Sequence, residues 1–212
     1  MKWQDLLNLL GGVTLFESSM LLAAEDSPAE VRRQISRWLT SGRLIQVRRG
    51  LYALALPHAR ELPGTFAVAS RLRRPSYVSL ESGLAYHGVI PEVVPVVTSV
   101  TTGRPGSFKT PVGGFVYRHI HPSLFWGYQK VELGSGQSSY IAFPEKALLD
   151  LFHFTSGNIR RSFVDELRLA PGQLDPGRLQ QFAKRAAKPK LIRAASLTVR
   201  FLGDEMGREA ML

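Results

Sequence analysis

Residues 27–54 read SPAEVRRQISRWLTSGRLIQVRRGLYAL. This stretch opens with Ser27-Pro28, a preferred N-cap residue followed by the residue best suited to the first helical position, and Glu30 stands three residues after the cap. Apolar residues then recur at helical spacing, at Val31, Ile35, Trp38 and Leu39. The pattern predicts an amphipathic helix that begins after Ser27 and ends at Ser41-Gly42.

A β-hairpin is predicted directly after this helix. Residues 44–47 and 51–54 are short apolar runs, and Arg48-Arg49-Gly50 between them has the composition of a tight turn. Upstream, residues 2–10 have a helical apolar stripe, and the spacing of Thr14 and Glu17 predicts a second helix over residues 15–24. Three helices followed by a hairpin is the order of a winged helix-turn-helix.

The rest of the chain is predicted to be a larger, mixed α+β C-terminal domain that ends in helices. Residues 57–64, which hold two Pro and one Gly, are interpreted as a linker between domains at residues 1–56 and 65–212. Helices are expected over residues 65–74, 81–87, 144–154, 161–169, 176–187 and 189–202. Strands are expected near residues 77–80, 93–101, 115–120 and 139–143. Residues 103–114 contain four Gly and two Pro and are expected to form a loop.

The charge of the chain is basic and unevenly distributed. The 212 residues carry a formal net charge of +10, which favours polyanionic partners such as nucleic acid. Residues 27–60 hold seven Arg and one acidic residue, and residues 178–200 hold seven Lys or Arg and no acidic residue. The first ten residues lack the pattern of a secretory signal, and the apolar runs are too short for a membrane span. A cytoplasmic protein without membrane contact is therefore expected.

The polar face of the helix after Ser27 is expected to contact double-stranded DNA. Arg33 and Arg37 lie one helical turn apart, and Arg and Gln side chains suit base edges in the major groove. Two adjacent Arg residues at the hairpin tip suit the DNA backbone or the minor groove. The predicted DNA-binding residues are Pro28, Arg32, Arg33, Gln34, Ser36, Arg37, Arg48 and Arg49. The alternative is a solvated helix face beside a short, soluble hairpin. Trp38 and Tyr52 are expected in the core.

A second basic surface is predicted near the C-terminus. Its residues are Lys184, Arg185, Lys188, Lys190 and Arg193. They stand in or beside two predicted helices. Three interpretations remain open: a solvated helix face, a second contact with the DNA backbone, or a docking surface for an acidic partner or RNA.

No catalytic site, cofactor or metal is predicted, and the protein is not expected to be an enzyme. Cys is absent, which excludes disulfides, thiolate metal sites and cysteine nucleophiles. His119 and His121 are expected on one face of a strand, but no third ligand has motif spacing. A nuclease-like acidic site is considered for Glu145, Lys146 and Asp150. The start of a helix is the better interpretation, because an acidic residue is favoured in the first turn.

Three stretches resemble the AbiEi family, the antitoxins of AbiE-type abortive-infection systems, which are type IV toxin–antitoxin modules. Residues 27–54 resemble its winged helix, and YVSLESGLAYHG at residues 77–88 and AFPEKALLDL at residues 142–151 resemble two recurrent blocks. The resemblance implies a bacterial antitoxin that represses its own promoter, commonly as two copies on an inverted repeat. It also implies a C-terminal domain that counteracts a nucleotidyltransferase-like toxin, with direct contact left open. By position, the family's DNA-reading helix and wing correspond to residues 28–37 and 48–49.

Two other classes of function stay open. One is a stand-alone winged-helix transcription regulator whose C-terminal domain dimerises or senses a ligand. The other is an interaction protein that binds a toxin or RNA through the basic C-terminal domain.

Overall fold

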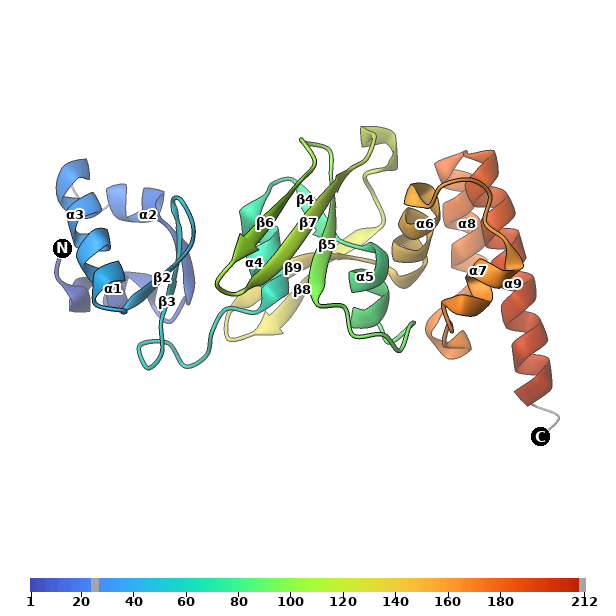
Figure 1. Ribbon diagram of the computed structural model, residues 1–212, viewed down its shortest axis with the longest axis horizontal. Coiled ribbons are helices and arrows are strands. Elements are labelled where there is room, and N and C mark those ends of the chain that lie inside the picture. The colour runs from blue at the N-terminus through green and yellow to red at the C-terminus, as the bar shows by residue number, and fades with distance from the viewer. Residues whose placement is uncertain (24–26, 210–212) are drawn as a thin grey trace.

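The protein is elongated, and its structure is mixed α+β, which confirms the predicted class. The computed structural model describes residues 1–23 and 27–209, except for the side chains of residues 171 and 205–209. Three parts follow one another along the longest axis in chain order (Figure 1): helices with a small sheet, a larger sheet, and a group of helices. Within the described residues, no helix has the length and hydrophobicity that crossing a bilayer requires.

The first part joins three helices to an antiparallel sheet. Its elements are α1 (Trp3–Leu10), β1 (Leu15–Glu17), α2 (Ser18–Leu22), α3 (Pro28–Thr40), β2 (Leu44–Arg48) and β3 (Leu51–Leu54). The sheet has the order β1-β3-β2. The predicted bounds of α1, α3 and the hairpin agree with the structure to within about one residue. Trp38 and Tyr52 are buried in the core beneath α3, as expected.

The helix predicted over residues 15–24 is wrong in its first turn. Leu15, Phe16 and Glu17 form β1 instead and pair with residues 51–53 of β3. The backbone carbonyl of Thr14 accepts a hydrogen bond from Leu54 (3.0 Å), so this segment continues the sheet. Long-range strand pairing therefore overrides the local capping signal of Thr14 and Glu17. Ala24, the last residue of that prediction, lies outside the described residues.

The central part is a six-stranded mixed sheet of order β6-β7-β5-β4-β9-β8. Its strands are β4 (Ser76–Val78), β5 (Val96–Thr101), β6 (Gly106–Thr110), β7 (Gly113–His119), β8 (Tyr128–Gly134) and β9 (Gln137–Ala142). The loop predicted over residues 103–114 is wrong because β6 pairs antiparallel with β7 there. No strand was expected at β8. Both missed strands lie at the sheet edges, where they are exposed along much of their length and lack a strong apolar pattern.

Helices cover both faces of this sheet. They are α4 (Thr65–Leu72), α5 (Leu80–Tyr86), α6 (Pro144–Phe154), α7 (Arg161–Glu166), α8 (Pro176–Ala186) and α9 (Pro189–Glu209). Two short 3-10 helices, η1 (Pro122–Leu124) and η2 (Pro171–Gln173), complete the fold. One apolar cluster joins Tyr77 and Val100 of the sheet to α5–α9, and a second joins Val78 and Phe115 to α4. All six helices coincide with predicted ones, although α9 extends beyond its predicted end.

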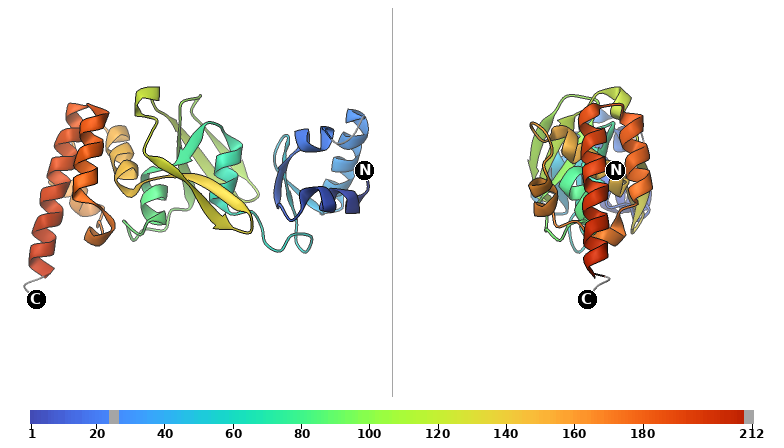
Figure 2. Two further views of the ribbon diagram at one scale, coloured as in Figure 1. Left: turned by 180° about the vertical axis from the view of Figure 1, so that it is seen from behind. Right: turned by 90° about the vertical axis from the view of Figure 1, so that its right-hand side faces the viewer.

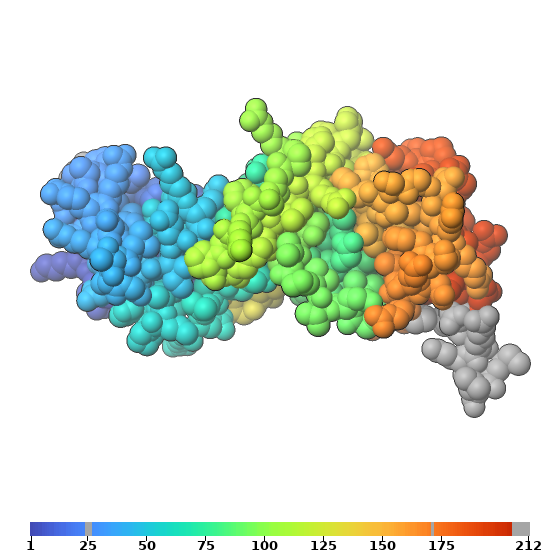
Figure 3. All heavy atoms as spheres, in the orientation of Figure 1, coloured from blue at the N-terminus to red at the C-terminus, as the bar shows by residue number. Residues whose placement is uncertain are grey.

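Strand β3 is buried on both of its faces and joins the first two parts. Tyr52 and Leu54 pack into the cluster beneath α1 and α3. Leu51 and Ala53, which point to the opposite side, belong to the cluster that contains α4 and the larger sheet. Figure 3 shows the resulting contact between the N-terminal part and the centre of the molecule. The small sheet is therefore a layer between the N-terminal helices and the rest of the protein.

Replacing Leu51 by Ala should destabilise the protein by about 2–5 kcal/mol, because the Leu51 side chain is fully buried in this shared layer. Urea unfolding followed by circular dichroism measures the change. Leu62→Ala is the matched control because Leu62 is 45% exposed, and its effect should stay within about 0.5 kcal/mol. Equal effects of the two substitutions would contradict the two-sided packing of β3.

Candidate functional site

Helix α3 presents a basic face at one end of the molecule. The Ser27 hydroxyl accepts a hydrogen bond from the Glu30 amide (3.4 Å), which confirms the predicted N-cap. Val31, Ile35 and Trp38 hold the helix against the core. The opposite face exposes the predicted contacts Pro28, Arg32, Arg33, Ser36 and Arg37. The structure thus places these residues on one exposed surface.

Glu30 modifies this surface in a way that sequence reasoning missed. Its carboxylate forms an ion pair with Arg33 (2.6 Å) and accepts a hydrogen bond from the side-chain amide of Gln34 (2.9 Å). Arg33 and Gln34 are therefore already engaged within the helix, whereas Arg32 and Arg37 have no ion pair with any described residue. The i, i+3 and i, i+4 spacing of the three residues was the signal for this arrangement.

The hairpin tip lies toward the body of the protein. The Gly50 carbonyl accepts a hydrogen bond from the Ser18 amide (2.9 Å), which holds the tip against the start of α2. Gly50 has a φ of +83°, the left-handed backbone that the tight turn between β2 and β3 requires. Arg48 and Arg49 are exposed. Arg48 is near enough to the larger sheet for its charge to act on the pKa of the Tyr117 phenol, which burial raises and this charge lowers.

Some residues of the second predicted basic surface contact other parts of the protein, and others face the solvent. The Arg185 guanidinium lies over the Trp126 ring, 4.4 Å from its centroid, and the Lys190 ammonium donates a hydrogen bond to the Thr155 carbonyl at the end of α6. Lys184 and Arg193 are exposed, and Lys188 is half-buried. Burial, reinforced by the charge of Lys188, lowers the pKa of the His153 imidazole.

The two basic surfaces lie at opposite ends of the molecule. Figures 1 and 2 both place α3 at one end of the longest axis and α8 and α9 at the other. A short DNA duplex placed against α3 would therefore not reach α8 and α9 unless it ran along that axis.

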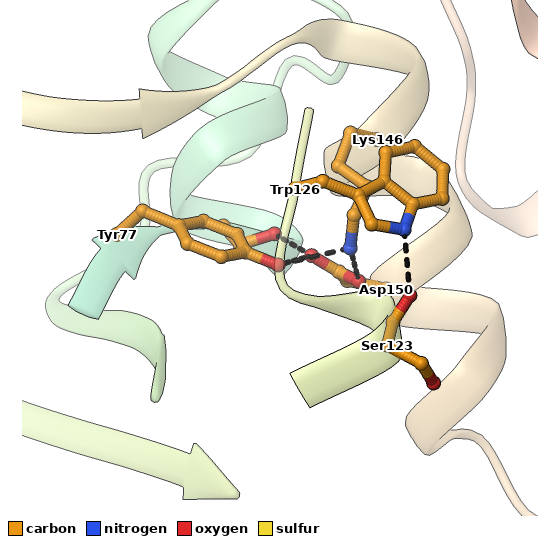
Figure 4. Close-up of polar contacts among 6 residues, drawn as sticks. Tyr77, Ser123, Trp126, Lys146 and Asp150 are labelled. Atoms are coloured by element: carbon orange, nitrogen blue, oxygen red, sulfur yellow. Dashed lines mark hydrogen bonds and ion pairs between the residues drawn. The ribbon is translucent and has the colours of Figure 1, made fainter. Parts of the chain in front are cut away.

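A buried polar cluster lies between β4 and α6 (Figure 4). The Asp150 carboxylate accepts hydrogen bonds from the hydroxyls of Tyr77 (2.9 Å) and Ser79 (2.8 Å). The Lys146 ammonium donates to the Tyr77 oxygen (2.9 Å) and forms an ion pair with Asp150. Lys146 and Asp150 are each 2% exposed, and Tyr77 and Ser79 are fully buried. The sequence signal was a Lys and an Asp four residues apart in a largely apolar helix.

An aromatic side chain covers the buried polar cluster. The Trp126 indole covers the Lys146 ammonium, which lies 5.2 Å from the centre of the ring (Figure 4). Gly127, with a φ of +76°, leaves room for the Lys146 side chain, since a Cβ there would come within 3.0 Å of it. Burial lowers the pKa of Lys146, and burial together with Asp150 raises the pKa of Tyr77. The arrangement joins α6 to the sheet and leaves its charged atoms without solvent access.

The residues considered for a nuclease or metal site do not converge. Glu145 is fully buried and faces Arg178 (2.9 Å) and the Asp175 amide (2.8 Å) instead of the Asp150 cluster. The prediction that His119 and His121 share one strand face is wrong, because His119 ends β7 and His121 caps η1. Among the described residues, no three His, Asp or Glu side chains are grouped for metal binding.

The two sequence blocks at residues 77–88 and 142–151 meet in this region. Val78 pairs with Ile141, next to the second block, and the His87 imidazole is 2.8 Å from the Ala142 carbonyl oxygen. A Cβ on Gly83 would lie 3.0 Å from the Ala147 Cβ, so Gly83 permits the close packing of α5 on α6. Together with the buried cluster, these contacts make the two blocks one packed unit.

Comparisons with protein-family models and with curated proteins give no match for this chain. The resemblance to the AbiEi family therefore stays a prediction.

Removing one partner of the buried ion pair should be costly. Asp150→Leu leaves the Lys146 charge unpaired and should destabilise the protein by about 3–5 kcal/mol, measured by urea unfolding. Combining it with Lys146→Met should recover much of this loss, because an apolar pair replaces both charges.

The matched control is Glu132→Gln, which removes the exposed ion pair between Glu132 and Lys130. Its effect should stay below about 1 kcal/mol. A similarly small effect of Asp150→Leu would show that the buried cluster contributes nothing to the joint between β4 and α6.

Proposed function

We propose that residues 1–56 are a winged helix-turn-helix that binds double-stranded DNA through α3 and reads its sequence. The observation that carries the proposal is the exposed basic face of α3. The opposite face of the helix packs on the core through Val31, Ile35 and Trp38, and α3 lies at one end of the long axis of the molecule. The order of α1, β1, α2, α3, β2 and β3 agrees with this class of domain. A single helix of this kind fits the major groove of B-form DNA.

Arg32 and Arg37 are proposed as the principal contacts. Both are exposed and have no ion pair with a described residue, so DNA binding requires no internal contact to break. Arg33 and Gln34 have to exchange their contacts with Glu30 for contacts with DNA. Because the exposed Arg33–Glu30 pair contributes little stability, this exchange costs little free energy. Pro28 and Ser36 complete the surface.

Arg48 and Arg49 are proposed as contacts with the DNA backbone. Arg48 ends β2 and Arg49 lies in the turn that follows, and positions at a hairpin tip suit phosphate better than bases. Because the tip is hydrogen-bonded to Ser18, these two cations have a defined position relative to α2 and α3.

We further propose that the protein is an antitoxin that represses its own promoter and counteracts a nucleotidyltransferase-like toxin. Support comes from the resemblance of residues 27–54, 77–88 and 142–151 to the AbiEi family, and from the packing of the last two blocks against each other. Inspection of the adjacent gene separates this role from that of a stand-alone regulator.

The second basic surface favours a further interaction with a polyanion, either DNA or RNA. Lys184 and Arg193 are exposed and take no part in the ion pairs among the described residues. Since α8 and α9 lie at the end opposite α3, this interaction involves a different nucleic-acid segment or a long duplex along the molecule.

Fluorescence anisotropy on DNA from upstream of the gene, compared with a scrambled duplex, tests sequence reading by α3. Arg32→Ala with Arg37→Ala should remove the preference for the upstream DNA, since a good bidentate base contact contributes about 1–3 kcal/mol of discrimination. The matched control is Arg104→Ala with Lys109→Ala, which removes two exposed cations near or in β6. This control should keep the preference. Equal binding of both duplexes by the wild-type protein would refute sequence-specific recognition.

The salt dependence of binding tests the second basic surface. Lys184→Gln with Arg193→Gln should weaken binding to a long duplex equally for both sequences. It should also lower the slope of log K against log salt by about 0.9 for each phosphate that the variant no longer neutralises. These two residues are chosen because Arg185 and Lys190 have structural contacts. An unchanged slope would mean that α8 and α9 do not contact DNA.

A further inference from the structure

An apolar groove lies between α7 and the segment that leads from α5 into β5. Its volume is about 530 Å³, and its apolar lining includes Ile90, Val96, Phe163 and Leu167. Val93 stands at its edge with 92% of its surface exposed, and Val96 is 39% exposed. In Figure 3, the green segment around residues 80–100 borders the orange segment around residues 155–170 in this region. Exposed apolar side chains around a groove of this kind indicate an interaction site.

The charge of this groove is opposite to that of the whole chain. The chain has 27 Lys and Arg against 17 Asp and Glu, yet the described residues that line the groove include Glu81, Glu92 and Glu166 and no Lys or Arg. Glu92 is neutralised by an ion pair with Arg168. Glu81 and Glu166 have no ion pair with a described residue, so their charges face the groove and the solvent uncompensated.

The apolar surface continues on the other side of residues 90–94. A second hollow of about 370 Å³ shares Ile90, Glu92, Val93 and Val94 with the groove. Tyr86, which is 40% exposed, and Phe66 form its far wall, with their ring centres 5.7 Å apart. The two hollows flank one extended segment and are open to solvent instead of enclosed. Small-molecule sites bury most of the surface of their ligand, so these open hollows suit a segment of polypeptide better.

We propose that this groove is the docking site for a protein partner that presents an apolar segment carrying Lys or Arg. The apolar residues of that segment cover Val93, Val96 and Leu167. Its cations pair with Glu81 and Glu166, which fixes its position along the groove. The same two carboxylates repel nucleic acid. This surface is therefore separate from the proposed DNA contacts, and its occupation does not depend on DNA binding.

Selection of random peptides displayed on phage against the immobilised full-length protein tests the proposal. The enriched peptides should combine large apolar residues with Lys or Arg. A synthetic peptide of the enriched sequence is then titrated by fluorescence anisotropy. Glu81→Gln with Glu166→Gln should weaken its binding by about fivefold to tenfold, the effect of losing two exposed ion pairs. Val93→Asp should abolish binding without unfolding the protein, since the Val93 side chain is almost fully exposed.

Asp165→Asn is the matched control. Asp165 precedes Glu166 on α7 and is exposed, but it does not line the groove, so its substitution should leave peptide binding unchanged. Enriched peptides without Lys or Arg, or a peptide affinity insensitive to Glu81→Gln with Glu166→Gln, would overturn the proposal. Self-association of the protein that Val93→Asp abolishes would also overturn it, by placing a second copy in the groove.

Discussion

The burial of β3 on both faces is the constraint on which the arrangement of the molecule depends. Tyr52 and Leu54 face the core that supports α3, while Leu51 and Ala53 face α4 and the larger sheet. Rotating the N-terminal part away from the centre would expose Leu51 and Ala53 to water, which is unfavourable for apolar surface. The position of α3 relative to the rest of the protein is therefore set by packing. Consequently, if α3 binds a duplex as proposed, that duplex also has a defined orientation relative to α8 and α9.

The charge of the protein is separated along its length, and this separation permits independent interactions. Basic residues gather on α3 at one end and around α8 and α9 at the other, while Glu81 and Glu166, which have no ion pair with a described residue, line a separate groove between α7 and residues 90–98. At physiological salt, exposed charges more than about 8 Å apart are largely screened from one another. The field at each surface therefore depends on its own charged residues more than on the net charge of +10, and the proposed partners are argued from these local charges.

Much of the fold was predictable because the helices carry their signals locally. The Ser27-Pro28 start and the apolar stripe of α3 specify that helix from adjacent residues. Strands β1, β6 and β8 were not predicted. Each is stabilised by pairing with another strand, and a short stretch of sequence gives no information about that partner. The candidate site shows the same limit. Helical spacing placed Arg33 and Arg37 one turn apart on one face, but the position of Arg48 near Tyr117 and the Trp126 cover over Lys146 depend on tertiary structure.

The location of the two recurrent blocks determines what the AbiEi resemblance can support. Both blocks meet in the core, through Tyr77, Asp150 and the contact of Gly83 with Ala147. Residues of this kind specify a fold, and one fold serves many functions. DNA binding is inferred separately, from the exposed side chains of α3, and does not need the resemblance. The promoter and toxin roles rest on the resemblance. They therefore have to be tested on surface residues, since substitutions in the shared core would destabilise the protein whatever it binds.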